Sequence, residues 1–445
     1  MSRQGEAGAQ GAVVSWSGLG AALVQPAMLA LISLAALVYI FSVGRALRGR
    51  ARDWDFCVYY ASAVAAREHL DPYTTDIATL GARFGLQAGR IDRATDPPTF
   101  ILLFEPFTLL KPAAAYWLWI ALNALAFVAA LFVLLGPASG LSARAAIVLA
   151  ALAIFYPPVG DHFYYSQSKI PVLLMMAAMM RWMERGHERA AGLVLALAGL
   201  LRAFPLALLG YVVVRRRWAA FRWTFIGLAA GGASTMSLFG VANSLSFLRA
   251  VGFLTGNHWL DLSANIALDS FVSRIFRFSF GPHPATAVAV ARTIVVTLAM
   301  LALVGSTVEA TVRRRAGRDP DSAAFCLWVV TSVMLSPTAW IHYMVLVLVP
   351  FAQLAVAANF GRASRRALWA AVASYALIAA VCTGCPAEPG APLLVPILPD
   401  LRTGGVFILG QIPFMAVFAA WLSARWFVVD EVRDAPARAC CLGAA

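Results

Sequence analysis

Long apolar runs, repeated along the chain and separated by short polar loops, limit most strongly what this sequence can fold into. Hydrophobic residues occupy 61% of the 445 positions, and charged residues only 13%. A soluble protein carries about a quarter charged residues, whereas roughly 20 consecutive apolar residues span a bilayer as a helix. The sequence therefore predicts an all-α polytopic membrane protein with roughly 10–13 membrane segments.

The positive charge is distributed in a way that is typical of membrane loops. The formal net charge is +13, and the arginines occur in short clusters, such as 215–217 and 313–315, between apolar runs. Such clusters mark cytoplasmic loops under the positive-inside rule. We therefore expect membrane lipids around the chain, and no nucleic acid among its partners.

One integral membrane domain covering 1–445 accounts for this pattern. In the polar loop that follows the first span, residues 56–69 have apolar side chains at helical spacing, which predicts an interfacial helix. The six cysteines show no metal-ligand spacing, so no metal site is expected. The predicted order is a first span at 19–45, a polar loop at 46–97, core spans at 98–241, an outside loop at 242–284, further spans at 285–424 and a cytoplasmic tail at 425–445.

Two acids, Asp53 and Asp55, follow the first span directly and lie beside four arginines and four aromatic residues. Acids so close to a bilayer are costly and are candidate functional residues. They can also simply cap the following helix and balance the arginines, an explanation that suits Asp53 well. For Asp55 both interpretations stay open.

Three further positions carry polar groups next to apolar runs. Arg202 has apolar neighbours on both sides and needs an anionic partner, for which a phosphate is suitable. Gln167 and Lys169 precede a span, where a solvated loop also explains them. His342 follows Trp340 between two spans, where a structural histidine and an interfacial aromatic belt are alternatives.

Asp55, Arg202 and His342 together fit the transfer of a sugar from a lipid phosphate. The anomeric carbon passes through an oxocarbenium-like state, and a carboxylate can deprotonate the incoming hydroxyl from the opposite face. The leaving group is already a phosphate, so it needs a cation rather than an acid. One acid with a nearby arginine or histidine is sufficient for this reaction.

Several short motifs in order make the chain similar to glycosyltransferase family 87, a GT-C-type group of membrane proteins. Residues 55–60, Asp-Phe-Cys-Val-Tyr-Tyr, followed by Leu-Asp-Pro-Tyr at 70–73, resemble the family's first outside loop with its catalytic aspartate. Residues 166–169, Ser-Gln-Ser-Lys, resemble its Gly-Gln-x-Asn stretch and keep only the glutamine. Arg-Ala-Phe-Pro at 202–205 replaces Lys-x-x-Pro, and 336–342 resembles Ser-Pro-x-Ser-Trp-x-His.

The resemblance implies a GT-C-type helical bundle and an inverting, metal-independent transferase without a cofactor. Its donor would be a polyprenyl-phosphate sugar, typically mannose, and its acceptor a lipid or glycan. The site would face the periplasm or exterior of a bacterial inner membrane. The resemblance also places the loop at 46–97 outside, whereas the arginines after the first span, counted alone, would place it inside. Asp55 would be the general base; Arg202, His342, Lys169 and Gln167 would bind the donor phosphate or sugar; and Tyr59, Tyr60, Trp340 and Asn265 would line the pocket.

Two other functions are alternatives. A lipid or solute transporter with a relay of buried charges would move its substrate without forming a glycosidic bond, and it favours inverted repeats, which this sequence lacks. A surface-polysaccharide polymerase or ligase would use a lipid-diphosphate donor and outside arginines such as Arg83, Arg90 and Arg93.

Overall fold

The computed structural model describes residues 25–48, 54–87, 93–254, 264–281, 286–313, 322–381 and 411–430. Within these ranges the chain folds into helices, and an isolated β-bridge joins Asn265 to Trp340. The predicted all-α membrane fold is confirmed. Asp53 and Arg90 lie outside the described residues.

Five helical segments in the described ranges are long and apolar enough to cross a bilayer, and two bent helix pairs raise this number to seven. Three shorter apolar segments, Pro98–Leu109, Phe204–Val214 and Ser322–Leu335, lie between them. The total of 10–13 segments stays a prediction, because 382–410 lies outside the described residues. The five are α2 (Pro26–Leu47), α6 with a 3-10 turn (Pro112–Ser139), α16 (Thr286–Val312 of Thr286–Arg313), η4 with α18 (Ile341–Asn359) and α21 (Ile412–Val429 of Ile412–Asp430).

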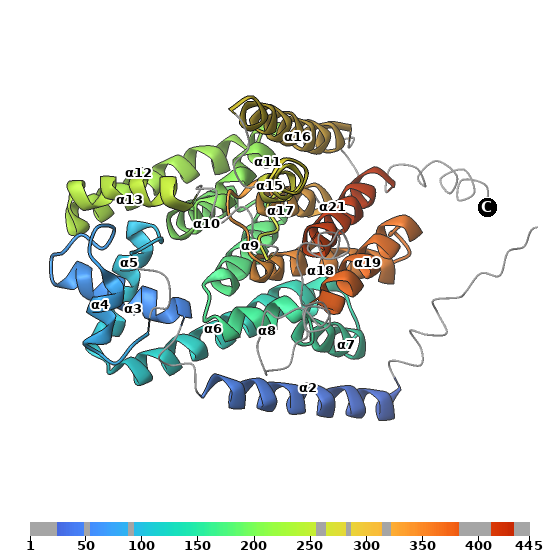
Figure 1. Ribbon diagram of the computed structural model, residues 1–445. Coiled ribbons are helices and arrows are strands. Elements are labelled where there is room, and N and C mark those ends of the chain that lie inside the picture. The colour runs from blue at the N-terminus through green and yellow to red at the C-terminus, as the bar shows by residue number, and fades with distance from the viewer. Residues whose placement is uncertain are drawn as a thin grey trace, which may run out of the picture.

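The first span, α2, lies along one side of the molecule and packs mainly on α7 (Ala143–Ile154) and α8 (Pro157–Tyr164) (Figure 1). Large apolar side chains such as Leu34, Leu37 and Phe41 are exposed along it. Since an isolated apolar helix is stable only in a hydrocarbon environment, this exposure marks α2 as a lipid-facing span.

The segment after α2 forms a small helical layer of its own. The helix expected at 56–69 is present as α3 (Trp54–Arg67), and α4 (Ile77–Ala82), α5 (Pro98–Phe104) and η1 (Glu105–Leu109) pack around it. Asp76 caps α4 because its carboxylate accepts hydrogen bonds from the N–H groups of Ala78 and Thr79. Rings of Phe56, Tyr59 and Phe104 fill the centre of this layer, so α3 is held rigidly.

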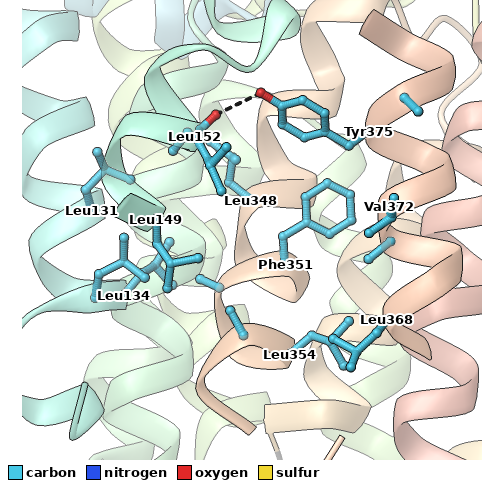
Figure 2. Close-up of a pocket in the computed structure, with 16 residues that line it drawn as sticks. Leu131, Leu134, Leu149, Leu152, Leu348, Phe351, Leu354, Leu368, Val372 and Tyr375 are labelled. Atoms are coloured by element: carbon cyan, nitrogen blue, oxygen red, sulfur yellow. Dashed lines mark hydrogen bonds between the residues drawn. The ribbon is translucent and has the colours of Figure 1, made fainter. Parts of the chain in front are cut away.

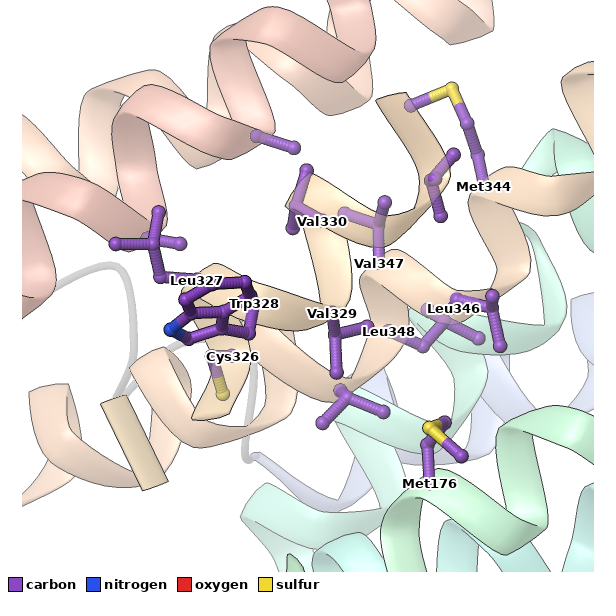
Figure 3. Close-up of a cluster of buried hydrophobic side chains, with 14 of the residues drawn as sticks. Met176, Cys326, Leu327, Trp328, Val329, Val330, Met344, Leu346, Val347 and Leu348 are labelled. Atoms are coloured by element: carbon purple, nitrogen blue, oxygen red, sulfur yellow. The ribbon is translucent and has the colours of Figure 1, made fainter. Parts of the chain in front are cut away.

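The main core is built by helices whose faces are apolar almost all round. It includes α9 (Lys169–Glu184), α17 (Ser322–Leu335) and α18 (Leu348–Asn359), and every residue from 322 to 334 in α17 is buried. Figure 3 shows Met176 of α9 near Val329 and Leu348 of the two other helices. A helix that is apolar on all sides and buried forms the centre of a bundle.

Glycines bring α10 (Glu188–Leu201) and α12 (Trp218–Phe239) into close contact. A Cβ at Gly192 would lie 2.3 Å from the carbonyl oxygen of Ala220, and one at Gly227 would lie 2.6 Å from Cβ of Ala196. Small residues at such positions let two membrane helices approach with their backbones nearly touching. This pair forms one wall next to the interruption that carries Arg202.

Two breaks in the helices correspond to features of the sequence. The run 190–214 is interrupted at Arg202, which has an extended backbone between α10 and η3 (Phe204–Ala207), and α11 (Leu208–Val214) continues the chain. The core spans, expected to reach residue 241, end with α12 at Gly240, whose φ of +87° favours glycine. The chain there turns through 109° into α13 (Val241–Leu254).

An apolar cavity of about 390 Å³ lies among α6 (Pro112–Leu135), α7, α18 and α19 (Arg365–Val381) (Figure 2). Leucine, alanine and valine side chains form its walls with Phe351 and Tyr375. The Tyr375 hydroxyl donates a hydrogen bond of 3.1 Å to the carbonyl of Leu152. This lining suits hydrocarbon and offers no charged group for a sugar phosphate.

Candidate active site

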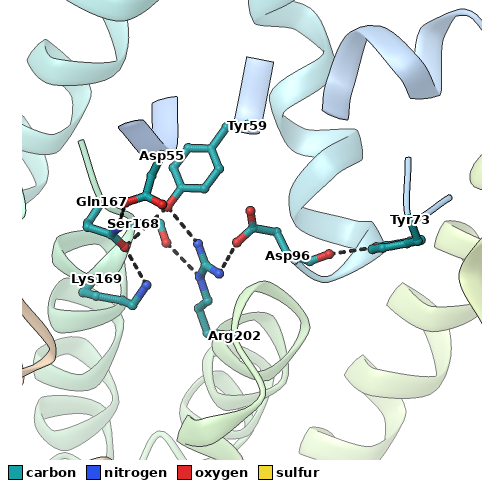
Figure 4. A network of polar contacts seen from close by, with 8 residues as sticks. All are labelled: Asp55, Tyr59, Tyr73, Asp96, Gln167, Ser168, Lys169 and Arg202. Carbon is teal, nitrogen blue, oxygen red and sulfur yellow. Dashed lines mark hydrogen bonds and ion pairs between the residues drawn. The ribbon is translucent and has the colours of Figure 1, made fainter. Parts of the chain in front are cut away.

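Asp55 lies in the first turn of α3 and points toward the start of α9 (Figure 4). Its carboxylate accepts a hydrogen bond from the side-chain amide of Gln167. The carbonyl oxygen of that amide accepts in turn from Lys169 Nζ at 2.9 Å and from the Tyr59 hydroxyl at 3.4 Å. Gln167 therefore links the candidate base to a cation and to an aromatic hydroxyl.

The turn that carries Gln167 has a strained residue immediately before it. Ser166 has a φ of +55°, in the left-handed region that favours glycine, and glycine is the residue of the resembled motif at this position. The indole N–H of Trp119 donates to the Ser166 carbonyl at 2.8 Å and fixes the turn. The turn directs Gln167 toward Asp55 from one side of α9.

Lys169 is the first residue of α9 and is only 2% exposed. Its ammonium lies over the ring of Tyr343 at 4.5 Å and donates to Gln167. In the described part of the chain, no carboxylate lies within ion-pair distance of it. A buried cation at a helix N-terminus, where the helix dipole is itself positive, strongly favours an anionic ligand.

Arg202 has an extended backbone between α10 and η3, and three side chains hold its guanidinium. Its guanidinium forms an ion pair with Asp96, donates from Nε to the Ser168 hydroxyl at 2.8 Å and from Nη2 to the Tyr59 hydroxyl at 3.2 Å. It also lies over the Phe100 ring at 4.9 Å. Arg202 is thus an anchored cation, whereas Lys169 has no counter-ion among the described residues.

Asp96 completes this cluster from the segment before α5. Its backbone carbonyl accepts from the Tyr73 hydroxyl at 2.7 Å. Its second carboxylate oxygen, Oδ2, is buried and has no hydrogen-bond partner in the described residues. The cluster therefore has unused acceptor capacity, in contrast to an ordinary core.

His342 lies in η4 (Ile341–Val347), next to Tyr343, whose ring contacts Lys169. Its Nδ1 is 3.4 Å from Oδ2 of Asp161 on α8, and its Nε2 is buried with no partner in the described residues. Lys169 and Arg202 are near enough to act on His342 electrostatically. The structure therefore brings the three predicted residues, Asp55, Arg202 and His342, into one charged region.

The environment of Asp55 raises its pKa from 3.8 to about 6. Burial is the main cause, and Asp96 adds to it, whereas Lys169, Arg202 and the Gln167 hydrogen bond act in the opposite direction. A carboxylate with a pKa near 6 is ionised at neutral pH yet is a stronger base than an ordinary aspartate.

The other predicted pocket residues have different positions. Tyr59 belongs to the charged cluster, whereas the Tyr60 hydroxyl donates to the carbonyl of Leu110 at 2.9 Å within the α3 layer. Asn265 accepts from the N–H groups of Ala267 and Ala339, each at 3.1 Å, and so holds the loop that leads through Trp340 to His342. Asn265 therefore shapes this region through the backbone.

Sequence reasoning missed two carboxylates of the region, Asp96 and Asp161. Asp96 precedes two prolines and was interpretable only as part of a turn, and Asp161 stands among aromatic and polar residues before Lys169. The signal for both is a carboxylate adjacent to an apolar run. Among the described residues, no group of three or more His, Cys, Asp or Glu side chains is arranged to hold a metal ion.

The fold and this cluster define an all-helical membrane protein whose site brings carboxylates and cations together. The sequence model of glycosyltransferase family 87 matches residues 95–337, more than half of the chain. The chain therefore belongs to glycosyltransferase family 87, as its motifs predicted. Gln167, Lys169 and Arg202 lie in the matched range, whereas Asp55 precedes it and His342 follows it. No curated protein and no solved structure matches the chain.

Proposed function

We propose that this glycosyltransferase moves a hexose, with mannose the first candidate, from a polyprenyl-phosphate sugar to a lipid or glycan acceptor. The reaction inverts the anomeric carbon and takes place at a site that faces the periplasm or exterior. The observation that carries the proposal is the placement of Asp55, a partly buried carboxylate with a raised pKa, beside the buried Lys169 and the half-buried Arg202.

In this mechanism Asp55 removes the proton from the acceptor hydroxyl. The oxygen then forms a bond to the anomeric carbon while the bond from that carbon to the phosphate oxygen breaks, and both electrons of that bond leave with the polyprenyl phosphate. The transition state is oxocarbenium-like, so attack from the face opposite the phosphate inverts the centre. No second carboxylic acid is needed, because a phosphate is already a good leaving group.

The two cations support the departure of the phosphate in different ways. Lys169 has no carboxylate partner among the described residues and lies at the dipole-positive end of α9, so it is the side chain best suited to bind the phosphate. Arg202 is already paired with Asp96 and is fixed in direction by Ser168 and Tyr59. Its fixed positive charge stabilises the negative charge that develops on the departing phosphate.

The test of this proposal is the variant Asp55→Asn. Membranes containing the full chain would be given radiolabelled polyprenyl-phosphate mannose, and label entering lipid or glycan products would be measured. Loss of a general base lowers the rate by about 100- to 10,000-fold. The matched control is Asp76→Asn, which neutralises an exposed carboxylate in the same loop and keeps a good helix cap. Transfer by Asp55→Asn at the level of this control would exclude the assigned base.

The donor that is used distinguishes a transferase from a polymerase, and the product that is formed distinguishes a transferase from a transporter. Supplying monophosphate- and diphosphate-linked sugars to the purified chain distinguishes a transferase from a polymerase or ligase. Arg83, an arginine expected to serve a polymerase, forms a bidentate ion pair with Glu68 at 3.0 and 3.1 Å. A transporter would move labelled lipid across a vesicle membrane and form no new glycosidic bond.

A further inference from the structure

The short helix α8 places a carboxylate beside His342. Pro157 and Pro158 occupy the first positions of α8, and the chain bends there by 52° from α7. Proline is favoured at the start of a helix because it lacks an N–H and has a fixed φ. The bend directs α8 toward η4, so that Asp161 meets a residue 181 positions later in the chain.

The contact between these side chains is buried and specific to one ring nitrogen. Asp161 Oδ2 lies 3.4 Å from His342 Nδ1. The Asp161 side chain is 12% exposed and the His342 side chain 6% exposed. The other nitrogen, Nε2, is buried and has no hydrogen-bond partner in the described residues. In its ionised state the Asp161 carboxylate can only accept a hydrogen bond, and in that state it favours a proton on Nδ1.

The neighbouring histidine provides a contrast within the same helix. His162 Nε2 is 3.0 Å from the Asn123 side-chain oxygen, and the Asn123 amide nitrogen donates to the Trp119 carbonyl. A neutral amide therefore orients His162, and its role is to tie α8 to α6. The carboxylate instead faces His342, the ring that adjoins Tyr343 and the two site cations.

We propose that Asp161 is a positioning residue that holds His342 in the Nδ1-protonated tautomer and turns Nε2 toward the bound donor. Resting on the proposed transferase function, the inference assigns Nε2 as the acceptor of a hydrogen bond from a hydroxyl of the donor sugar. A neutral ring suits this task, because Lys169 and Arg202 already supply positive charge close by. Asp161 itself does not touch the substrate.

The first test reads the tautomer directly and needs no sugar transfer. The full chain, labelled with ¹⁵N-histidine and placed in lipid nanodiscs without donor, contains six histidines. The signal of His342 is identified by its loss in His342→Gln. We expect protonated Nδ1 in the wild type and in Asp161→Glu, and a loss of that preference in Asp161→Ala. An unchanged His342 tautomer in Asp161→Ala would overturn the inference.

The second test measures coupling in the reaction, with polyprenyl-phosphate mannose as donor. A carboxylate that orients a functional histidine contributes about 10- to 100-fold, so Asp161→Ala should lower kcat/KM by that factor, with partial rescue in Asp161→Glu. The double variant Asp161→Ala with His342→Gln should be no slower than His342→Gln alone, because both changes remove one function. Fully additive losses would show that Asp161 does not act through His342.

The matched control is Glu184→Gln, which removes a carboxylate with 14% exposure from an ion pair with Arg181 at 2.9 Å. This variant should keep the wild-type kcat/KM and the wild-type His342 tautomer. If no donor yields transfer in the wild type, the proposed function fails, and the tautomer measurement still decides the role of Asp161. If transfer occurs and the tautomer does not depend on Asp161, only the positioning role fails.

Discussion

Two buried polar networks in this protein are built on different plans. In one, Thr307 and Thr331 share a 3.0 Å hydrogen bond, and the Trp421 indole N–H reaches Thr307 at 3.3 Å and Thr331 at 3.1 Å, between α16, α17 and α21. Each threonine hydroxyl also lies 2.9 Å from a carbonyl oxygen of its own helix, which is an alternative acceptor for its single proton. The other network joins Asp55, Gln167, Lys169, Arg202 and Asp96 and is charged.

The difference lies in what each network leaves unused. The threonine network is neutral, and its side chains have partners within the protein, so it ties three helices together. The charged network keeps a carboxylate oxygen of Asp96 and a ring nitrogen of the adjacent His342 without partners in the described residues. A closed polar network serves packing, whereas an open one retains groups for a ligand at a cost in stability.

The largest expected effect is on stability, from breaking the central ion pair of the charged network. Asp96→Ala leaves Arg202 buried without its counter-ion, which costs about 3–5 kcal/mol. Thermal unfolding of the purified chain in detergent would measure this loss. Glu68→Ala, which breaks the exposed pair with Arg83, should cost at most about 1 kcal/mol. Equal losses of stability in both variants would show that the Asp96–Arg202 pair contributes no more than an exposed ion pair.

The next effect concerns binding of the donor. Lys169→Met removes the buried cation that lacks a carboxylate partner among the described residues, and a hydrogen bond to a charged group is worth about 1.5–3 kcal/mol. We expect kcat/KM for polyprenyl-phosphate mannose to fall roughly 10- to 150-fold, mainly through a higher KM. The only other lysine, Lys111, is exposed, so Lys111→Met should leave both constants unchanged. A Lys169→Met enzyme with wild-type KM would remove Lys169 from phosphate binding.

The pH profile should report the base of the charged network. Asp55 has a pKa raised from 3.8 to about 6, and only its ionised form can accept the acceptor proton. Activity is therefore fully present above that pKa, and log kcat/KM should fall by about one per pH unit as the pH drops below it. Rates measured from pH 4.5 to 8 test this expectation. A profile that stays level down to pH 5 would show that Asp55 has an ordinary pKa or is not the base.

The smallest effect should come from the closed network. Thr331→Val removes a hydroxyl that contacts Thr307 and Trp421, which should lower the free energy of unfolding by about 1 kcal/mol. Transfer activity should stay at the wild-type level, because this network lies among α16, α17 and α21. Thr297→Val, at an exposed hydroxyl of α16, is the control for stability. A large activity loss in Thr331→Val would contradict the separation of the two networks.

The sequence predicted the members of the charged network better than their connections. Asp55 and Arg202 are indicated by the cost of a charged residue beside an apolar run. Gln167 and Lys169, which a solvated loop also explains, enter the site through the resemblance to the family motif. The structure places all four together, although 147 positions separate Asp55 from Arg202. Which partner each residue takes depends on helix packing, which apolar periodicity alone does not specify.

Asp96 and Asp161 show the limit of this reasoning. The proline-rich segment after Asp96 and the prolines before Asp161 are turn and helix-start signals that describe the local backbone only. Their partners, Arg202 and His342, are 106 and 181 positions away. The 109° turn into α13 is similar, because Gly240 permits such a bend without requiring it.

The 3-10 segment η4 carries two contacts of the site on adjacent residues, His342 and Tyr343. A 3-10 helix has three residues per turn, so consecutive side chains point about a third of a turn apart. His342 therefore faces Asp161 while Tyr343 presents its ring to Lys169. A rotation of η4 about its axis would displace both contacts together. Because His342 and Tyr343 are adjacent in η4, a displacement of Lys169 that turned the Tyr343 ring would also turn the imidazole away from Asp161.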